Sequence, residues 1–183
     1  MKQLAKILKS GGIAVIRTDT LYGIVGLAHN PSVVRRIYEI KNRDETKPAI
    51  VLIADFHDLK RFPVRFTDPL LRILEKHWPG KVSIIVPVDD ERGEHFHLHR
   101  GTRGIAFRIP ADEDLRELLR TTGPLIAPSA NPEGLPPAKN IREAMRYFGT
   151  AVHYYHDGGT CEETKPSKII RITETYEVEI IRE

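Results

Sequence analysis

The chain has 183 residues, of which 40% are hydrophobic and 29% are charged, and its formal net charge is +3. These values are typical of a soluble globular protein, and we expect a single domain over residues 1–183. The mild positive charge suits an anionic partner, but it does not choose between a nucleotide and a nucleic acid. The first residues contain no long apolar segment, so we expect neither a signal peptide nor a membrane helix, and a cytoplasmic location is the default.

The first third of the chain alternates between helix and strand. Residues 2–10 have apolar side chains at helical spacing and are followed by two glycines, which end the helix. Residues 13–16 are expected to form a buried strand. The segment "HNPSVVRRIYEIKNR" predicts a helix, because Asn30 is a good N-cap and Pro31 suits the first helical position.

The same alternation continues to the end of the chain. Further helices are expected at 67–78, where Thr67 is the cap, at 112–122 and at 141–148. Further strands are expected at 49–54, 82–88, 104–109, 124–127, 151–155, 168–172 and 177–181. Apolar strands separated by helices indicate an α/β fold with a mixed sheet, and the last two strands suggest an antiparallel hairpin.

Several common catalytic motifs are absent from the sequence. There is no GxxxxGK[ST] phosphate loop, and "GIVGLA" lacks the spacing of a dinucleotide fingerprint. No HExxH, CxxC or GxSxG occurs, and the single cysteine, Cys161, excludes an internal disulfide and a multi-cysteine zinc site. These absences disfavour a P-loop enzyme, a Rossmann dehydrogenase and a serine hydrolase.

Two polar loops follow apolar strands. "IRTDTLYG" follows the first strand, and "APSANPEGLPPAKN" follows the strand at 124–127. Each has a simple structural explanation, since Thr18 or Thr20 could cap a turn and four prolines could stiffen a surface loop. Because ligands of α/β proteins bind at strand ends, the two loops together favour a binding site.

A third segment, "KNRDETKP", concentrates positive charge in residues 41–48. Cations at Lys41 and Arg43 could simply complement the partial negative charge at a helix C-terminus. Lys47 lies beyond the helix and just before a strand, so helix electrostatics does not account for it. A ligand that carries phosphate groups would account for all three cations.

Five segments occur in an order that resembles a known family: "RTDTLYGI", "IYEIKNRDETKPAIVLI", "WPGKVSIIV", "IAFRIP" and "PLIAPSANPEGLPP". They are similar to the YrdC family of threonylcarbamoyl-AMP synthases, in its short, single-domain form. The similarity extends from about Leu4 to Arg182. It implies an α/β fold in which a twisted mixed sheet with flanking helices surrounds a basic cavity.

The resemblance implies a nucleotidyltransferase that joins L-threonine, bicarbonate and ATP into threonylcarbamoyl-AMP and releases pyrophosphate. The product serves the modification of tRNA through a separate transferase, so tRNA or that transferase is a possible partner. No covalent nucleophile and no protein metal ligand are expected, because positioning and positive charge are sufficient for this chemistry. Mg²⁺ is expected to enter with ATP, held by phosphates and water.

The resemblance also assigns site residues in two groups. The ATP-binding group comprises Lys41, Arg43, Lys47, Ser129, Asn131 and Arg182. The threonine-binding group comprises Thr20, Arg108, Ala127 and Ser167. Arg108 suits the substrate carboxylate; it could instead be a surface residue at a strand edge, but it interrupts an apolar strand, where a charge needs a partner. Ala127 is expected to contribute backbone atoms.

The chain departs from the family pattern in several places. Arg17, Asp44 and Lys168 replace the usual residues, Leu52 stands where some members have histidine, and residues 132–134 are "PEG" where the family has an "SxG". Asp44 stands where proline is usual, and nothing in the sequence explains it.

Two further features remain open. His95, His97 and His99 alternate, which on a strand could hold a metal; their charged, glycine-bounded surroundings favour a solvated loop instead. Asp19 is a possible base for the threonine amine or a turn-forming residue, and it is not assigned to the site.

The main alternative to the synthase is an RNA-binding or regulatory module of the same fold without synthase activity. A weaker alternative is a related AMP-anhydride chemistry on another carbamoyl donor. The combination of Lys41, Arg43 and Lys47 with the "SAN" loop favours an enzyme, because an RNA-binding protein needs only scattered positive charge. Oligomeric state and selectivity between serine and threonine are not indicated by the sequence.

Overall fold

The computed structural model describes residues 1–162 and 165–183, and within them nine strands form one mixed sheet. The α-helices are α1 (Lys2–Lys9), α2 (Pro31–Lys41), α3 (Asp68–Glu75), α4 (Phe96–His99), α5 (Glu113–Thr122) and α6 (Ile141–Phe148). Two 3₁₀ helices, η1 and η2, cover Phe56–Arg61 and Gly149–Ala151. The strands are β1 (Ala14–Arg17), β2 (Tyr22–Leu27), β3 (Ile50–Leu52), β4 (Val82–Pro87), β5 (Gly104–Arg108), β6 (Leu125–Ile126), β7 (Tyr154–Tyr155), β8 (Lys168–Ile172) and β9 (Val178–Arg182).

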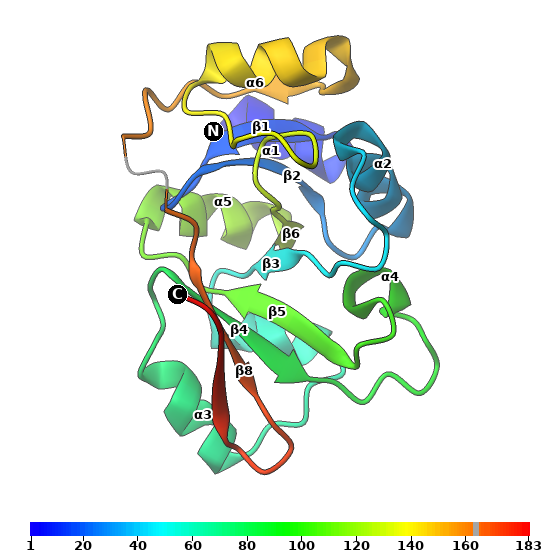
Figure 1. Cartoon of the computed structure of the whole chain (residues 1–183), viewed down its shortest axis with the longest axis vertical. Coiled ribbons are helices and arrows are strands. Elements are labelled where there is room, and N and C mark those ends of the chain that lie inside the picture. Colours follow the sequence, from blue (N-terminus) through cyan, green and yellow to red (C-terminus); the bar gives the residue numbers. More distant parts are fainter. Residues whose placement is uncertain (163–164) are drawn as a thin grey trace.

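The strand order is β7-β1-β2-β6-β3-β5-β4-β8-β9. Neighbours pair in both directions: β3 runs parallel to β5 and β4 parallel to β8, whereas β1–β2, β4–β5 and β8–β9 are antiparallel. The sheet twists through the molecule, with α6 at one end and α3 and the β8–β9 hairpin at the other (Figure 1). The predicted α/β class, mixed sheet and terminal hairpin are therefore confirmed.

Hydrophobic side chains form a core on each side of the sheet. Along β1, Val15 belongs to one cluster, while Ala14 and Ile16 belong to the other, as the two-residue period of a strand requires. The smaller cluster is closed by α1 and α5, which contact each other. The larger cluster is covered by α2, α3, α4 and α6.

The predicted helix starts are confirmed by their capping interactions. Asn30 Oδ1 accepts hydrogen bonds from the N–H groups of Ser32 (3.1 Å) and Val33 (3.2 Å), and Pro31 is the first residue of α2. Thr67 caps α3 in the same way, by accepting from Leu70 N–H. These local signals operate independently of the tertiary fold.

Two predicted loops contain regular structure. The first is β2, which begins within the segment "RTDTLYGI". A Cβ atom on Gly26 would lie 2.4 Å from Val33 Cγ1, so glycine lets α2 pack directly on this strand. The second is "HFHLH", of which the last four residues form the short helix α4 and His95 is the N-cap.

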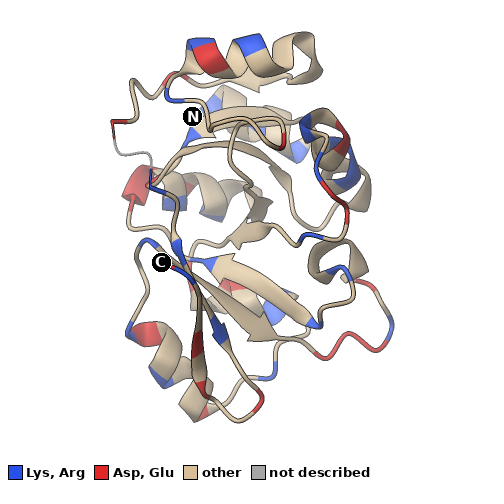
Figure 2. Ribbon diagram, viewed as in Figure 1, with Lys and Arg blue, Asp and Glu red and all other residues tan. Residues whose placement is uncertain are grey.

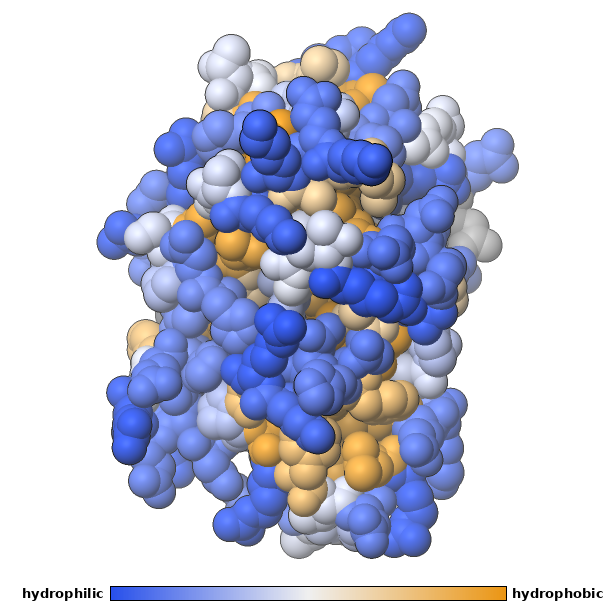
Figure 3. Space-filling view, turned by 180° about the vertical axis from the view of Figure 1, so that it is seen from behind, coloured by the Kyte–Doolittle hydropathy of each residue, from blue (hydrophilic) through white to orange (hydrophobic). Residues whose placement is uncertain are grey.

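Polar side chains cover most of the surface. Lys and Arg are distributed over the whole molecule, with several on α2 and the segment that follows it (Figure 2). Seen from behind, the surface is mainly hydrophilic, with apolar residues grouped in its lower half (Figure 3). In the described part of the chain, no helix combines the length and apolar character needed to cross a bilayer.

Candidate active site

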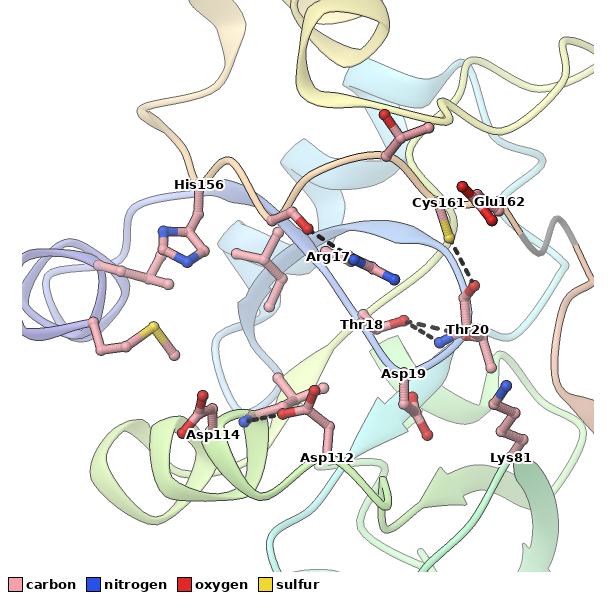
Figure 4. Close-up of a pocket in the computed structure, with 16 residues that line it drawn as sticks. Arg17, Thr18, Asp19, Thr20, Lys81, Asp112, Asp114, His156, Cys161 and Glu162 are labelled. Atoms are coloured by element: carbon pink, nitrogen blue, oxygen red, sulfur yellow. Dashed lines mark hydrogen bonds between the residues drawn. The ribbon is translucent and has the colours of Figure 1, made fainter.

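A cavity of about 910 Å³ lies where the turn between β1 and β2 meets α1, α5 and residues 156–162 (Figure 4). Its size is that of sites for small molecules. The charged residues of its wall are Arg17, Lys81, Asp19, Asp112, Asp114 and Glu162. Carboxylates thus outnumber Lys and Arg in this wall, and the cations of residues 41–48 do not contribute to it.

The β1–β2 turn places Thr20 in the wall of this cavity. Thr18 Oγ1 accepts from the N–H groups of Thr20 and Leu21, both at 3.2 Å, and it donates to the carbonyl of Leu21 at 2.7 Å. Thr18 therefore stabilises the turn, which is the structural explanation that the sequence offered for it. Thr20 Oγ1 lies 3.1 Å from Thr18 Oγ1, and Thr20 is nearly buried beside the cavity.

Arg108 forms a buried ion pair with Asp19. The Nη2–Oδ1 distance is 3.0 Å, and the two side chains are only 4% and 6% exposed. Arg108 is thus not a surface residue at a strand edge. It is buried, and the charge of Asp19 balances its own. Burial raises the pKa of Asp19, and Arg108 partly opposes that shift. Burial lowers the pKa of Arg108, whereas Asp19 raises it.

Ser167 and Arg182 contact each other, and Arg182 lies near Arg108. Ser167 is buried, and its Oγ lies 2.8 Å from Ser83 Oγ. Its carbonyl accepts from Arg182 Nη2 at 2.7 Å and from Nε at 3.2 Å. The charge of Arg182 contributes to the lowered pKa of Arg108, after burial and the opposing effect of Asp19. Arg182, predicted for ATP, is therefore placed close to the residues predicted for threonine.

Lys41 joins the end of α2 to the loop at residues 127–140. It is 1% exposed, and its Nζ donates to the carbonyls of Ser129 and Asn131. Burial lowers the pKa of Lys41 to about 7; Arg43 adds to this shift and Glu133 opposes it. In this arrangement Lys41 positions the loop.

Arg43 and Lys47 differ in how firmly the fold holds them. Arg43 Nη2 donates to the Pro48 carbonyl at 2.9 Å, and its guanidinium carbon lies 5.5 Å from the centre of the Tyr38 ring. Lys47 has a side chain that is 55% exposed, and it forms an ion pair with Glu133. Lys47 is therefore the more accessible of these two predicted cations.

Asp44, which the sequence left unexplained, closes a local turn. Its Oδ1 accepts from the N–H of Thr46 at 2.9 Å and from the Thr46 hydroxyl at 2.7 Å. These bonds lower the pKa of the Asp44 carboxyl. An Asx turn thus takes the place of the turn that proline would favour.

The "SAN" loop is held by its own hydrogen bonds. Ser129 Oγ donates to Asn131 Oδ1 at 2.6 Å, and Asn131 Nδ2 donates to the carbonyls of Pro132 (2.9 Å) and Leu135 (2.7 Å). Ala130 N–H donates to the Tyr22 carbonyl at 2.7 Å, which fixes the loop to β2. Ala127 N–H donates to the Ile50 carbonyl at 2.9 Å, so only the carbonyl of Ala127 could serve a ligand.

Nine of the ten predicted residues therefore form two groups, and Ala127 lies just before the loop of the second group. Thr20, Arg108, Ser167 and Arg182 belong to one group, and Lys41, Arg43, Lys47, Ser129 and Asn131 belong to the other. Three residues beside these groups were not assigned from the sequence, namely Asp19, Ser83 and Glu133. The sequence indicated a possible role for Asp19, which lies in "TDT". The positions of Ser83 and Glu133 beside the site are visible only in the folded structure.

The histidines of α4 are engaged by protein groups. His99 Nε2 lies 3.0 Å from Asp90 Oδ2, and His97 Nε2 lies 2.9 Å from the Ala28 carbonyl oxygen. Over the described residues, no group of three or more His, Cys, Asp or Glu side chains is placed to bind a metal ion. The prediction that these histidines lie in a solvated loop is wrong, because His99 is buried.

Several known proteins are similar to this chain. A protein of Methanocaldococcus jannaschii named putative threonylcarbamoyl-AMP synthase is 32% identical over 173 residues, which cover 92% of this chain and 78% of that protein. The threonylcarbamoyl-AMP synthase of Nitrosococcus oceani is 31% identical over 167 residues, covering 90% of this chain and 89% of that protein.

Among solved structures, the crystal structure of Pyrococcus abyssi Sua5 complexed with L-threonine has a TM-score of 0.87 and 26% identity. The match covers 99% of this chain and 53% of that chain, so the present chain spans about half of that protein. The family model Sua5_yciO_yrdC, described as "Telomere recombination", matches residues 6–183. The chain therefore belongs to the Sua5/YciO/YrdC family.

Proposed function

We propose that this protein is an L-threonylcarbamoyladenylate synthase, which forms threonylcarbamoyl-AMP and pyrophosphate from L-threonine, bicarbonate and ATP. The observation that carries the proposal is the presence of two groups of polar residues. One contains the buried Arg108–Asp19 pair beside a cavity, and the other contains the cations Arg43 and Lys47. The names of the two relatives favour the synthase over an RNA-binding module.

The Arg108–Asp19 pair suits a zwitterionic amino acid. Arg108 would bind the α-carboxylate of threonine through parallel hydrogen bonds, and Asp19 would then face the ammonium group. The amine must lose a proton before it captures CO₂ or bicarbonate as a carbamate. Because burial raises the pKa of Asp19, this carboxylate is a better proton acceptor than an ordinary aspartate.

The second group suits the nucleotide. The carbamate oxygen would attack the α-phosphate of ATP and pyrophosphate would leave, so negative charge must be stabilised on the departing phosphates. Arg43 and Lys47 would provide the positive charge that stabilises these phosphates, while Lys41 would fix the Ser129 loop. Mg²⁺ would enter with ATP, bound by phosphate oxygens and water, and no protein ligand is assigned to it.

The proposal extends to the cellular role. The mixed anhydride would pass to a separate transferase that modifies tRNA, and the enzyme would work in the cytoplasm, where its substrates occur. The further nucleotidyltransferase classification follows from transfer of the adenylyl group.

Pyrophosphate release tests the proposal. The purified protein would receive Mg²⁺, ATP, bicarbonate and L-threonine, and each substrate would be omitted in turn. We expect pyrophosphate only when all of them are present, together with a new product of the mass of threonylcarbamoyl-AMP. Release that ignores threonine, or no release combined with tight and salt-sensitive tRNA binding, would contradict a synthase.

Matched arginine variants sharpen this test. Arg108→Met should raise the KM for threonine, while Arg171→Met, which changes an exposed arginine of β8, should leave it unchanged. If both variants lost activity equally, Arg108 would have no specific part in threonine binding.

A further inference from the structure

The carboxylate of Glu133 occupies a position typical of a phosphate group. Its Oε1 forms an ion pair with Lys47 Nζ, and its Oε2 accepts a hydrogen bond from the backbone N–H of Asp44 at 2.6 Å. A lysine ammonium combined with a backbone N–H is an arrangement by which proteins bind phosphate oxygens. The segment at residues 41–48 therefore binds an anion that belongs to the protein itself.

The backbone places this carboxylate there. Glu133 N–H donates to the Lys41 carbonyl at 2.7 Å, and Lys41 Nζ donates to the carbonyls of Ser129 and Asn131. These bonds hold the loop against the end of α2 without using the Glu133 side chain. Loss of the carboxylate contact would therefore leave the loop attached.

The contact is also accessible to exchange. The side chains of Lys47 and Glu133 are 55% and 31% exposed, so a ligand could replace the carboxylate without opening the core. The bond from Lys47, followed by that from Asp44 N–H, lowers the pKa of Glu133, so the group is charged at neutral pH. Glu133 lies in the "PEG" sequence, one of the places where this chain departs from its family's pattern.

We propose that Glu133 is an internal competitor of ATP: its carboxylate takes the place of a phosphate group at Lys47 and Asp44 N–H, and the polyphosphate of ATP displaces it. This inference rests on the proposed ATP site. The carboxylate would compete with the phosphates that ATP has and an adenylate lacks, so it should weaken polyphosphate binding more than AMP binding. Once pyrophosphate has left, Glu133 returns to Lys47, which favours release of the products.

Nucleotide binding provides the first test. Calorimetry would measure the Kd of a non-hydrolysable ATP analogue, of inorganic tripolyphosphate and of AMP for the wild type, Glu133→Gln and Glu45→Gln. Glu45→Gln removes one negative charge from the segment that Glu133 contacts. Glu45 is exposed, and within the described residues its side chain has no hydrogen bond or ion pair. An exposed ion pair predicts roughly two- to fivefold tighter binding of both polyphosphates by Glu133→Gln. AMP binding should change less, and Glu45→Gln should resemble the wild type.

The reactivity of Lys47 gives a readout that needs no nucleotide. A lysine acylating reagent, followed by peptide mass spectrometry, should modify Lys47 faster in Glu133→Gln than in the wild type or Glu45→Gln. Equal rates would overturn the proposed contact.

The outcomes separate this inference from the proposed function. If the wild type binds the ATP analogue and Glu133→Gln binds it equally or more weakly, Glu133 does not compete with phosphate, while the ATP site stands. If none of the three proteins binds the analogue or tripolyphosphate, the ATP site and the role of Glu133 are both wrong.

Discussion

Asp19 and Arg108 form an ion pair of 3.0 Å, although they lie in different strand-end segments and both side chains are almost fully buried. A buried pair of this kind contributes little net stability compared with apolar residues, but loss of one partner leaves an uncompensated charge. Arg108→Met should therefore lower the free energy of unfolding by about 3 kcal/mol, as measured by urea denaturation.

The double variant Asp19→Asn/Arg108→Met provides the control for that prediction. It should recover much of the loss, because neither charge remains buried without a partner. If the losses of stability in Asp19→Asn and Arg108→Met added up to the loss in the double variant, the two residues would not be energetically coupled.

Arg43 and Lys47 are predicted to respond differently to truncation. The resemblance assigned both to ATP binding, but Arg43 also contacts Pro48 and Tyr38. Lys47→Ala should raise the KM for ATP roughly tenfold, the value of one hydrogen bond to a charged group, without changing the Tm. Arg43→Ala should raise the KM and also lower the Tm.

Steady-state kinetics and thermal unfolding of the same preparations would check this difference. Lys60→Ala, a change of an exposed lysine in η1, is the control for a general effect of charge on ATP binding. A Tm loss in Lys47→Ala as large as that in Arg43→Ala would show that Lys47 is structural.

The sequence predicted those parts of the fold that local chemistry determines. Asn30 and Thr67 are caps whose hydrogen bonds lie within their own helices, and the spacing of apolar residues identified the main strands. β2 was not predicted because Gly26 weakens a strand pattern. The reason for a glycine there is the close packing of α2 on this strand, which only the fold shows. The turn at Asp44 could have been predicted from the sequence, because its partner Thr46 is only two residues away.

The site was predictable to a similar extent. The residues of both groups came from the resemblance, although the structure places Arg182 with the residues predicted for threonine rather than with those predicted for ATP. The anionic partners of the cations could not be foreseen, because the Arg108–Asp19 and Lys47–Glu133 contacts join segments that only the tertiary fold brings together. The same reason explains why Arg182 lies with Ser167.

Protein stability is predicted to fall on acidification through His29. This residue is exposed at the surface, but its ring stacks on Phe62. Partial desolvation lowers its pKa from 6.5 to about 4, with His95, Arg61 and His97 adding to the shift and Asp58 opposing it. The unfolded chain therefore binds the proton more readily, so the contribution of His29 to stability is present above pH 6.5 and is lost toward pH 4.

Thermal unfolding between pH 7.5 and 4.5 checks this prediction. His29→Gln should reduce the drop in Tm across this range, whereas His57→Gln, which changes another surface histidine, in η1, should not. An unchanged pH profile in His29→Gln would assign the acid sensitivity to other groups.

Lys41 is predicted to take up a proton when nucleotide binds. Burial, with a smaller effect of Arg43, lowers its pKa from 10.5 to about 7, so at pH 8 much of the free protein carries a neutral Lys41. A bound polyphosphate would bring negative charge to this segment and raise that pKa. Calorimetry at pH 8 in two buffers of different ionisation enthalpy should therefore give different binding heats for the wild type.

Lys41→Arg isolates the titration, because arginine can still donate to the Ser129 and Asn131 carbonyls but does not lose its proton. Its binding heat should be the same in both buffers. The same lowered pKa predicts that wild-type stability gains a contribution as the pH rises from about 7 to 10.5, since the unfolded chain binds more protons in that window. Equal heats for the wild type in the two buffers would mean that Lys41 keeps one protonation state throughout, and its role would then be confined to positioning the loop.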